Sequence, residues 1–198
     1  MRMNKYFSIF LIAGMVVFIS GCFSSRKVDR VSPDEQIDLS GRWNDTDSRL
    51  TAEALTDQML NERWLPDFER SHNRRPVVIV GLIRNKSHEH IDAETFIKDI
   101  EKAIIRDGSV RLVQAGEKRE ELRMERADQQ EFASAATAKK WGLELGADFM
   151  LQGTINSIVD EYRREKVVAY QIDLELTNLE TNEIVWIGDK KIKKYITD

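Results

Sequence analysis

The stretch VAYQIDLELT, residues 168–177, decides the fold, because apolar and polar side chains alternate strictly along it. A β-strand turns successive side chains to opposite faces of a sheet, so a period of two predicts a strand with one buried face. That buried face is expected to contain the apolar members of the stretch, Val168, Tyr170, Ile172, Leu174 and Leu176.

Two neighbouring segments predict partners for this strand. Phe149–Asn156 alternates in the same way, and Leu179–Glu183 has the composition of a tight turn before a last strand at Ile184–Ile196. The last strand carries several lysines, which suit the edge of a sheet because charged side chains discourage pairing with another chain. The sheet is therefore expected to end in an antiparallel meander.

A βαβ unit is predicted further upstream. Pro76–Ile83 is a continuous apolar and β-branched run, which indicates a central strand buried on both faces. A helix capped by Asp92 then places Phe96, Ile97, Ile100 and Ile104 on one stripe, and Gly108 suits its left-handed end. The short strand Val110–Val113 is expected to pair in parallel with the central strand.

Three further helices are expected around the sheet. The first starts among the N-capping residues 45–48 and runs to about Trp64, with Pro66 just beyond its end. The second is a charged helix whose thin apolar stripe consists mainly of Leu122 and Ala127. The third is expected to turn Ala138, Trp141 and Leu145 inward. The second and third helices span Glu117–Gln130 and the residues from Ser134 to Gly146.

These elements predict one fold class. The first half reads as α/β and the end as α+β, with a single mixed sheet of about five strands and flanking helices.

The N-terminus predicts an exported lipoprotein. Arg2 and Lys5 precede the apolar run Phe7–Ile19, which has the length of a signal-peptide core and is short for a membrane-spanning helix. The run ends in Ile19-Ser20-Gly21-Cys22, a pattern similar to the bacterial lipoprotein box. We therefore expect cleavage between Gly21 and Cys22 and lipid attachment to Cys22. The expected organisation is a signal peptide at residues 1–21, a lipidated cysteine with a flexible tether at 22–40, and a globular domain at 41–198.

Composition excludes several function classes. Cys22 is the only cysteine, so no internal disulfide can form. The 198-residue chain has a net charge of −4, and a mildly acidic surface of mixed sign argues against a nucleic-acid partner. No second apolar stretch reaches spanning length, so lipid is the expected membrane anchor. Phe23, rather than aspartate, follows the cysteine, which by resemblance to enterobacterial sorting favours the periplasmic face of the outer membrane.

Motifs for chemistry are missing from the sequence. It contains no G-x-S-x-G nucleophile motif and no Gly-rich phosphate loop. His72, His88 and His90 could together bind zinc, but polar loop histidines are usually solvated. The pair Glu120-Glu121 is expected on a helix, where adjacent residues point apart. We therefore predict a protein that is not an enzyme and has no cofactor, metal or small-molecule substrate.

Three segments are candidates for binding a partner protein. Arg84, Asn85 and Lys86 follow the central strand, at the sheet end where α/β proteins often place binding loops. Trp43 lies at the junction of tether and domain, where it either plugs the edge of the core or is displayed to a partner; the plug is the favoured reading. Tyr162–Lys166 forms a basic hairpin tip that is either solvated or in contact with an acidic partner or an anionic glycan.

Five segments, in order, resemble the LpoB-like family. They are GRWNDTDSRL (41–50), VVIVGLIRNKSHEHID (77–92), RLVQAGEKREELRMER (111–126), GADFMLQGTI (146–155) and YQIDLELTNLETNEIVWIG (170–188). The resemblance implies a small mixed sheet with flanking helices, similar to the N-terminal domain of TolB. It also implies a non-enzymatic outer-membrane lipoprotein that reaches through the peptidoglycan. Such a protein binds a small regulatory domain of a bifunctional class A penicillin-binding protein and stimulates its glycosyltransferase and transpeptidase activities.

The tether departs from the enterobacterial pattern, which has a long Pro-rich linker. Here Phe23–Ser40 has 18 residues and one proline, so it spans at most ~60 Å extended and about 20–25 Å as a coil. A different partner, a narrower envelope and a lipid in the inner membrane therefore all stay open. An alternative is an envelope assembly or export lipoprotein related in fold to the curli-secretion channel protein. It is disfavoured because no extra pair of long alternating segments is present.

Overall fold

The computed structural model describes residues 27–132 and 144–197. The chain divides into two compact units at Glu35–Gln36, and the domain bounds expected from the sequence stay a prediction. The expected signal peptide and Cys22 lie outside the described residues, as does most of the helix expected from Ser134.

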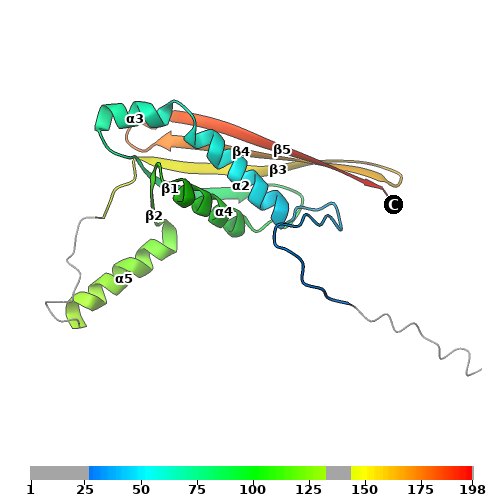
Figure 1. Ribbon diagram of the computed structural model, residues 1–198, viewed down its shortest axis with the longest axis horizontal. Helices are drawn as coiled ribbons and strands as arrows, with labels where there is room; N and C mark the ends of the chain where they lie inside the picture. Colours follow the sequence, from blue (N-terminus) through cyan, green and yellow to red (C-terminus); the bar gives the residue numbers. More distant parts are fainter. Residues whose placement is uncertain (1–26, 133–143, 198) are drawn as a thin grey trace, which may run out of the picture. The chain divides into compact units, whose positions relative to one another are not determined.

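Five strands form one mixed sheet (Figure 1). Strand β1 lies between β2 and β3 and is parallel to both, whereas β3, β4 and β5 pair antiparallel. This confirms the predicted mixed sheet of about five strands and its antiparallel end. The expected likeness to the TolB domain stays a prediction. The bounds are β1 Val77–Asn85, β2 Arg111–Val113, β3 Phe149–Tyr162, β4 Glu165–Asn178 and β5 Ile184–Thr197.

The alternation of side chains along β4 buries one face of the strand, as predicted. All five of its predicted core residues are buried, at no more than 2% exposure, and they face the helical layer. We call this side of the sheet the inner face and the opposite side the outer face. The residues of β5 paired with outward residues of β4, such as Ile187 opposite Glu175, also lie on the outer face.

Strand β1 is buried on both faces only in its first half. Val77, Val78, Ile79 and Val80 are all buried, as predicted. The register with β3 then shifts between Val80 and Ile83, and Leu82 reaches the outer face with 60% of its surface exposed. The expectation of two buried faces is therefore wrong for Leu82.

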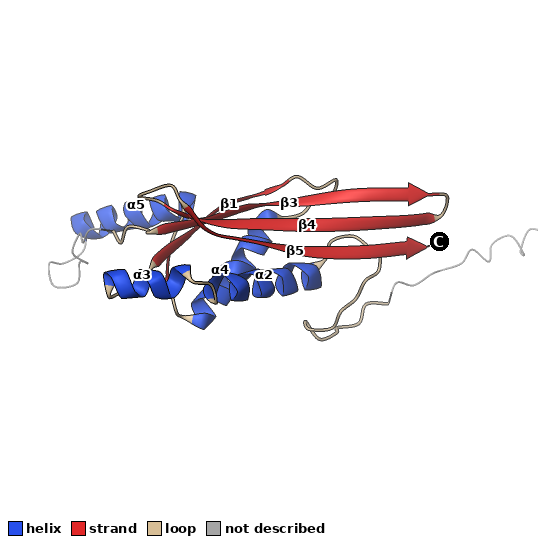
Figure 2. Cartoon of the chain, turned by 90° about the horizontal axis from the view of Figure 1, so that it is seen from above, coloured by secondary structure: helices blue, strands red, loops and turns tan. Residues whose placement is uncertain are grey.

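Helices α2 (Asp45–Leu60), α3 (Trp64–His72) and α4 (Ala93–Asp107) cover the inner face (Figure 2). Helix α4 is capped as predicted: the Asp92 side chain accepts from the amide of Glu94, and Gly108 ends the helix with φ of 78°. The core lies between these helices and the sheet. It contains Leu55 and Met59 of α2, Phe96, Ile100 and Ile104 of α4, and Leu151, Ile155 and Ile172 of the sheet.

The first predicted helix is in fact two helices. Helix α2 ends at Leu60, and α3 starts at Trp64 with Pro66 inside its first turn, so placing the end of one helix near Trp64 was wrong. Proline is tolerated in the first turn because the amide it lacks has no intrahelical partner there. The Trp64 indole donates to the carbonyl of Met59 at 2.6 Å and fixes the connection between the two helices.

Helix α5 (Gly116–Phe132) has the predicted charge but not the predicted packing. It stands apart from the other helices in both views (Figures 1 and 2), and Leu122 and Ala127 are exposed, so the expected apolar stripe is wrong. Leu145 is also exposed rather than turned inward. Arg123 binds the Glu144 carboxylate through two nitrogens, at 2.7 and 2.9 Å. No helix in the described part of the chain is long and apolar enough to cross a membrane.

Strands β3, β4 and β5 extend past the helices as a three-stranded ribbon (Figure 2). The β3–β4 pairing continues to Tyr162 opposite Glu165, which leaves Arg163 and Arg164 as a two-residue turn. Strand β5 extends equally far, with Thr197 opposite Glu165. The predicted hairpin tip at Tyr162–Lys166 is therefore confirmed as the end of this ribbon.

Candidate functional site

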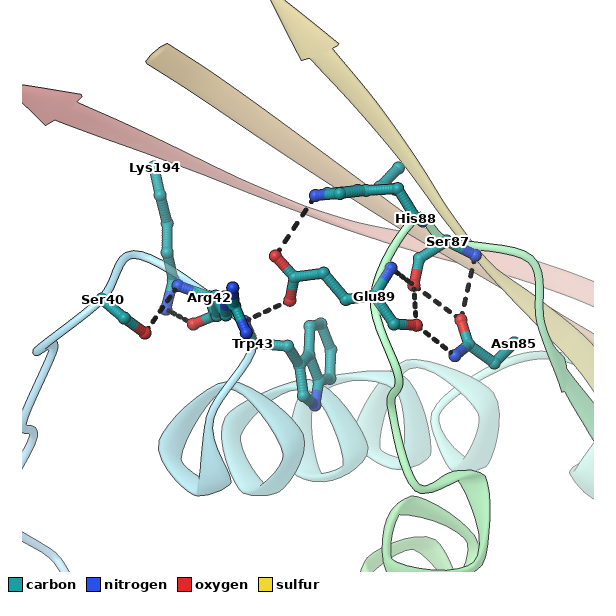
Figure 3. Close-up of polar contacts among 9 residues, drawn as sticks. Ser40, Arg42, Trp43, Asn85, Ser87, His88, Glu89 and Lys194 are labelled. Atoms are coloured by element: carbon teal, nitrogen blue, oxygen red, sulfur yellow. Dashed lines mark hydrogen bonds and ion pairs between the residues drawn. The ribbon is translucent and has the colours of Figure 1, made fainter. Parts of the chain in front are cut away.

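The segment Gln36–Asn44, which we call the arm, is fastened to the domain at two points. The first is Glu89, in the loop after β1 (Figure 3). Its carboxylate accepts from the backbone amide of Trp43 at 3.0 Å, and its other oxygen lies 3.3 Å from Nε2 of His88. This joins the arm to a loop 46 residues away in sequence.

Trp43 is the plug that the sequence favoured. Its half-buried ring packs edge-on against Phe96 of α4 and Tyr170 of β4, with centroids 6.3 and 5.5 Å apart. Burial, and after it the Glu89 carboxylate, raise the pKa of Tyr170, so its hydroxyl is protonated at neutral pH. That hydroxyl makes no hydrogen bond of standard geometry among the described residues. Aromatic contacts of this kind add to the area that Trp43 buries, so the ring fixes the arm on the core.

The second fastening point is Lys194 of β5. Its ammonium binds three oxygens, with Asp47 at 2.6 Å and Asp38 and the Arg42 carbonyl each at 2.9 Å. Only 12% of the Lys194 side chain is exposed. Burial lowers the pKa of Lys194, but the hydrogen bonds to Asp47 and Asp38 outweigh it and the net pKa is raised. The same contact lowers the pKa of Asp38 to about 2. We call the Lys194 and Glu89 contacts together the clasp.

Asn85 braces the loop that carries Glu89. Its side-chain nitrogen donates to the Glu89 carbonyl at 2.8 Å, and its oxygen accepts from the amide and hydroxyl of Ser87 at 2.9 and 2.7 Å (Figure 3). These bonds occupy both ends of the Asn85 amide inside the loop. Lys86 is exposed, and its backbone amide donates to the carbonyl of Ile155 at 2.8 Å.

His88 forms a chain of contacts that resembles a hydrolase triad. Its Nδ1 lies 2.7 Å from the Ser157 hydroxyl, while its Nε2 faces Glu89. The same hydroxyl accepts from the His88 backbone amide at 3.0 Å, which ties the loop to β3. His72 instead stacks on Phe68 of α3. No cluster of three metal-binding side chains exists within residues 27–132 and 144–197.

The outer face of the sheet is the second candidate surface. Exposed large apolar side chains gather there, namely Leu82, Ile158, Tyr162, Ile187 and Tyr195. Arg84 lies beside Leu82 and Ile187 at a shallow depression of about 220 Å³ between β1, β3, β4 and β5. Several exposed apolar side chains on one face of a sheet can form a protein-interaction surface.

The amino-acid sequence matches the model of one protein family. Residues 47–192 match the family of the peptidoglycan-synthase activator LpoB, which is most of the chain. The chain belongs to the LpoB family. LpoB-family proteins are regulatory activators rather than enzymes, so the Ser157–His88–Glu89 contacts of this member are structural.

Solved structures similar to this LpoB-family chain include the C-terminal domains of LpoB from Salmonella enterica and Escherichia coli. Each is 19% identical with a TM-score of 0.46, and they cover 74% and 77% of this chain and 98% and 99% of their own. Lipoprotein GNA1162 from Neisseria meningitidis is 16% identical, with a TM-score of 0.38, 61% of this chain covered and 83% of its own. No curated protein sequence is similar enough to count as a match.

The LpoB-family domain separates the site residues that the sequence grouped. Trp43 lies on the inner face, Asn85 ends β1 with its side chain bonded to the following loop, and Arg84 lies on the outer face. Sequence reasoning missed Glu89 and Lys194, because both were read as members of polar or edge segments. The only signal for Lys194 is that it shares the inner side of β5 with the apolar Ile192 and Ile196, where a lysine needs a partner.

Proposed function

We propose that this LpoB-family chain is a periplasmic lipoprotein of the outer membrane, anchored by lipid on Cys22, that binds and stimulates a class A penicillin-binding protein. Family membership supports the role of peptidoglycan-synthase activator. The class of the synthase, the lipid and the membrane are our inference from the resemblance and the lipoprotein box. The alternative related to the curli-secretion channel is not favoured by the family match.

The observation that carries the binding proposal is the set of exposed side chains on the outer face around Arg84. Its side chains stand on paired strands, so docking orders little that is not already ordered. Three strands ~4.8 Å apart and 14 residues long at ~3.3 Å each give a flat face of about 670 Å². A standard interface buries about 800 Å² per partner, so this face is of the right order.

Stimulation requires that the partner's active conformation binds the LpoB-family domain more tightly than its inactive one. A difference of ~1–3 kcal/mol suffices for an activation of about 5- to 150-fold. In this proposal Arg84 and Lys86 contact the synthase, Asn85 holds the loop in shape, and Trp43 fixes the arm. The domain then supplies binding energy and no catalytic group.

The test reverses charge at the proposed contact. Arg84→Glu and Lys86→Glu together are expected to weaken binding to a purified class A penicillin-binding protein at least ~10-fold. The melting temperature should barely change, because both side chains are exposed. Lys118→Glu, a charge reversal at another exposed lysine, on α5, is the control. Unchanged affinity of the double variant for a synthase that binds the wild type would refute these residues as contacts.

A further inference from the structure

The outer face of the ribbon contains a second depression, separate from the one at Arg84. Ala169 of β4 stands directly between Ile158 of β3 and Lys193 of β5 in the cross-strand register. The alanine methyl is much shorter than its two neighbours, so a trough of about 500 Å³ opens above it. Its other lining residues are Asn156, Ser157, Tyr170, Gln171, Lys191 and Ile192.

The trough joins an apolar wall to a cationic one. Ile158 is 74% exposed, which is unfavourable for an isoleucine unless something covers it. On the opposite wall, Lys193 forms no ion pair among the described residues, and Lys191 has only Asp189, at 3.7 Å. Arg163 and Arg164 at the tip also form no ion pair there, although the whole chain has a net charge of −4. Two exposed ammonium groups, those of Lys191 and Lys193, therefore stand side by side at the trough, although the ribbon as a whole also carries acidic side chains such as Asp160 and Glu165.

The floor of the trough is rigid. Strand β4 is paired along its whole length, with β3 on one side and β5 on the other, so Ala169 cannot shift without breaking both ladders. Towards the tip, the Tyr195 hydroxyl donates to the Glu165 carboxylate at 2.8 Å and links β5 to β4. A ligand would meet a preformed surface and lose little free energy in ordering it.

The chemistry of the walls favours a protein over a glycan. Sugar rings are bound by stacking on flat aromatic faces, but the nearest outer-face aromatics, Tyr162 and Tyr195, lie toward the tip and do not line the trough. An aliphatic wall facing two ammonium groups fits an apolar side chain flanked by carboxylates.

We infer that the trough between Ile158 and Lys193 is a docking site for an acidic segment of a partner protein. One apolar side chain of that segment enters above Ala169, and neighbouring carboxylates pair with Lys191 and Lys193. The trough lies beside the Arg84 depression on the same face, so one partner can cover both. The inference rests on the proposed function only in taking the penicillin-binding protein as that partner.

The first experiment uses this synthase and the full chain carrying Cys22→Ala. Ile158→Ser and Lys193→Glu are each expected to weaken binding at least ~10-fold, and the wild-type affinity should fall as salt rises. The control is Lys118→Glu, the same charge reversal at an exposed lysine of α5, which should change affinity less than ~2-fold. Wild-type affinity of the trough variants would overturn the inference and leave the proposed function standing.

The second experiment needs no synthase, so it distinguishes a failure of the trough inference from a failure of the proposed function. The probe is the blocked peptide Glu-Glu-Leu-Glu-Glu, titrated into the isotope-labelled chain and followed by NMR. Amide shifts are expected at Ile158, Ala169 and Lys193, and they should be lost with Glu-Glu-Ser-Glu-Glu or in Lys193→Glu. No shift at these amides, or shifts produced by soluble muropeptides but not by the leucine peptide, would overturn the acidic-protein assignment. If the wild type fails to bind the synthase but gives the expected peptide shifts, only the proposed partner is wrong.

Discussion

Lys194 is expected from the sequence to be a solvated edge lysine, but in the structure it is a nearly buried cation. It lies in a run of edge lysines that look solvated, yet its ammonium is nearly buried and binds three oxygens. Two of these belong to Asp38 and Arg42, more than 150 residues earlier in the chain. Removing one partner of a buried ion pair lowers the free energy of unfolding more than removing an exposed charge does, because the remaining charged group stays desolvated. The four lysines of β5 should therefore differ sharply in their effect on stability.

Lys194→Met is expected to lower the free energy of unfolding by about 2–3 kcal/mol, since it leaves Asp47 partly buried without its cation. Its neighbour Lys193→Met is the control and should stay within ~0.5 kcal/mol of wild type, because Lys193 is exposed and forms no ion pair among the described residues. Urea unfolding followed by circular dichroism measures both. Equal losses for the two variants would argue against the clasp.

Asp38 predicts a specific acid dependence of stability. Its pKa is lowered from 3.8 to about 2, chiefly by the hydrogen bond from Lys194. A carboxylate whose pKa is lower in the folded state stabilises the fold above the unfolded pKa. That contribution is lost as pH falls from about 4 to about 2. Stability measured across this range should fall less steeply in Asp38→Asn than in wild type. Parallel curves would show that Asp38 is unpaired in solution.

At the scale of elements, helix α2 starts at a complete capping box. The Asn44 side chain accepts from the Asp47 amide at 3.0 Å, and the Asp47 carboxylate accepts from the Asn44 amide at 3.0 Å. The Asp47 carboxylate also binds Lys194, so the start of α2 and the clasp share one residue. Loss of the cap should therefore loosen the arm as well as the helix.

Asn44→Ala is expected to cost about 1–2 kcal/mol of unfolding free energy, because the first turn of α2 loses its side-chain acceptor. Asn44→Ser keeps an acceptor and should cost less than ~0.5 kcal/mol. Thermal unfolding of the two variants gives the comparison. Hydrogen exchange should additionally be faster at Trp43 in the alanine variant. An alanine variant as stable as the serine variant would mean that the cap contributes little.

Strands were predictable from the sequence where one face is buried. The alternation in β4 is a local side-chain period, the first half of β1 is a local apolar run, and the ends of α4 at Asp92 and Gly108 follow from local capping chemistry. The break between α2 and α3 was missed because Pro66 can either follow a helix or occupy its first turn. The bulge that exposes Leu82 was missed because it depends on the register with β3.

The candidate site was less predictable than the fold. The plug could be favoured for Trp43, over display to a partner, because its large ring can fix the entering chain on the sheet. Its partner Glu89, and the role of Asn85 in holding the loop, depend on contacts that no local pattern encodes. Arg84 and Trp43 were grouped by polarity and position, but the sheet separates them onto opposite faces.

At the scale of the whole molecule, the proposed anchor makes a direct prediction. Cys22→Ala should yield an unlipidated protein that is recovered in the soluble fraction after cell lysis. The reason is the box Ile19-Ser20-Gly21-Cys22, in which the cysteine sulfur would carry the lipid. Fractionation and intact-mass spectrometry measure the outcome. Washed membranes that still retain the variant, or a wild-type mass without a lipid adduct, would contradict it.

The clasp has a mechanical consequence for the lipid anchor proposed above. With the arm docked, only residues 23–35 can extend between the proposed lipid and the fold, which is ~45 Å at full stretch. If the Lys194 and Glu89 contacts opened and Trp43 left the core, residues 36–43 would add about 28 Å more. A force applied to the anchor favours the undocked, longer state, because the force does work as the chain lengthens. With the proposed anchor, the distance that the domain can travel from the membrane therefore depends on whether the Lys194, Glu89 and Trp43 contacts hold, as well as on tether length.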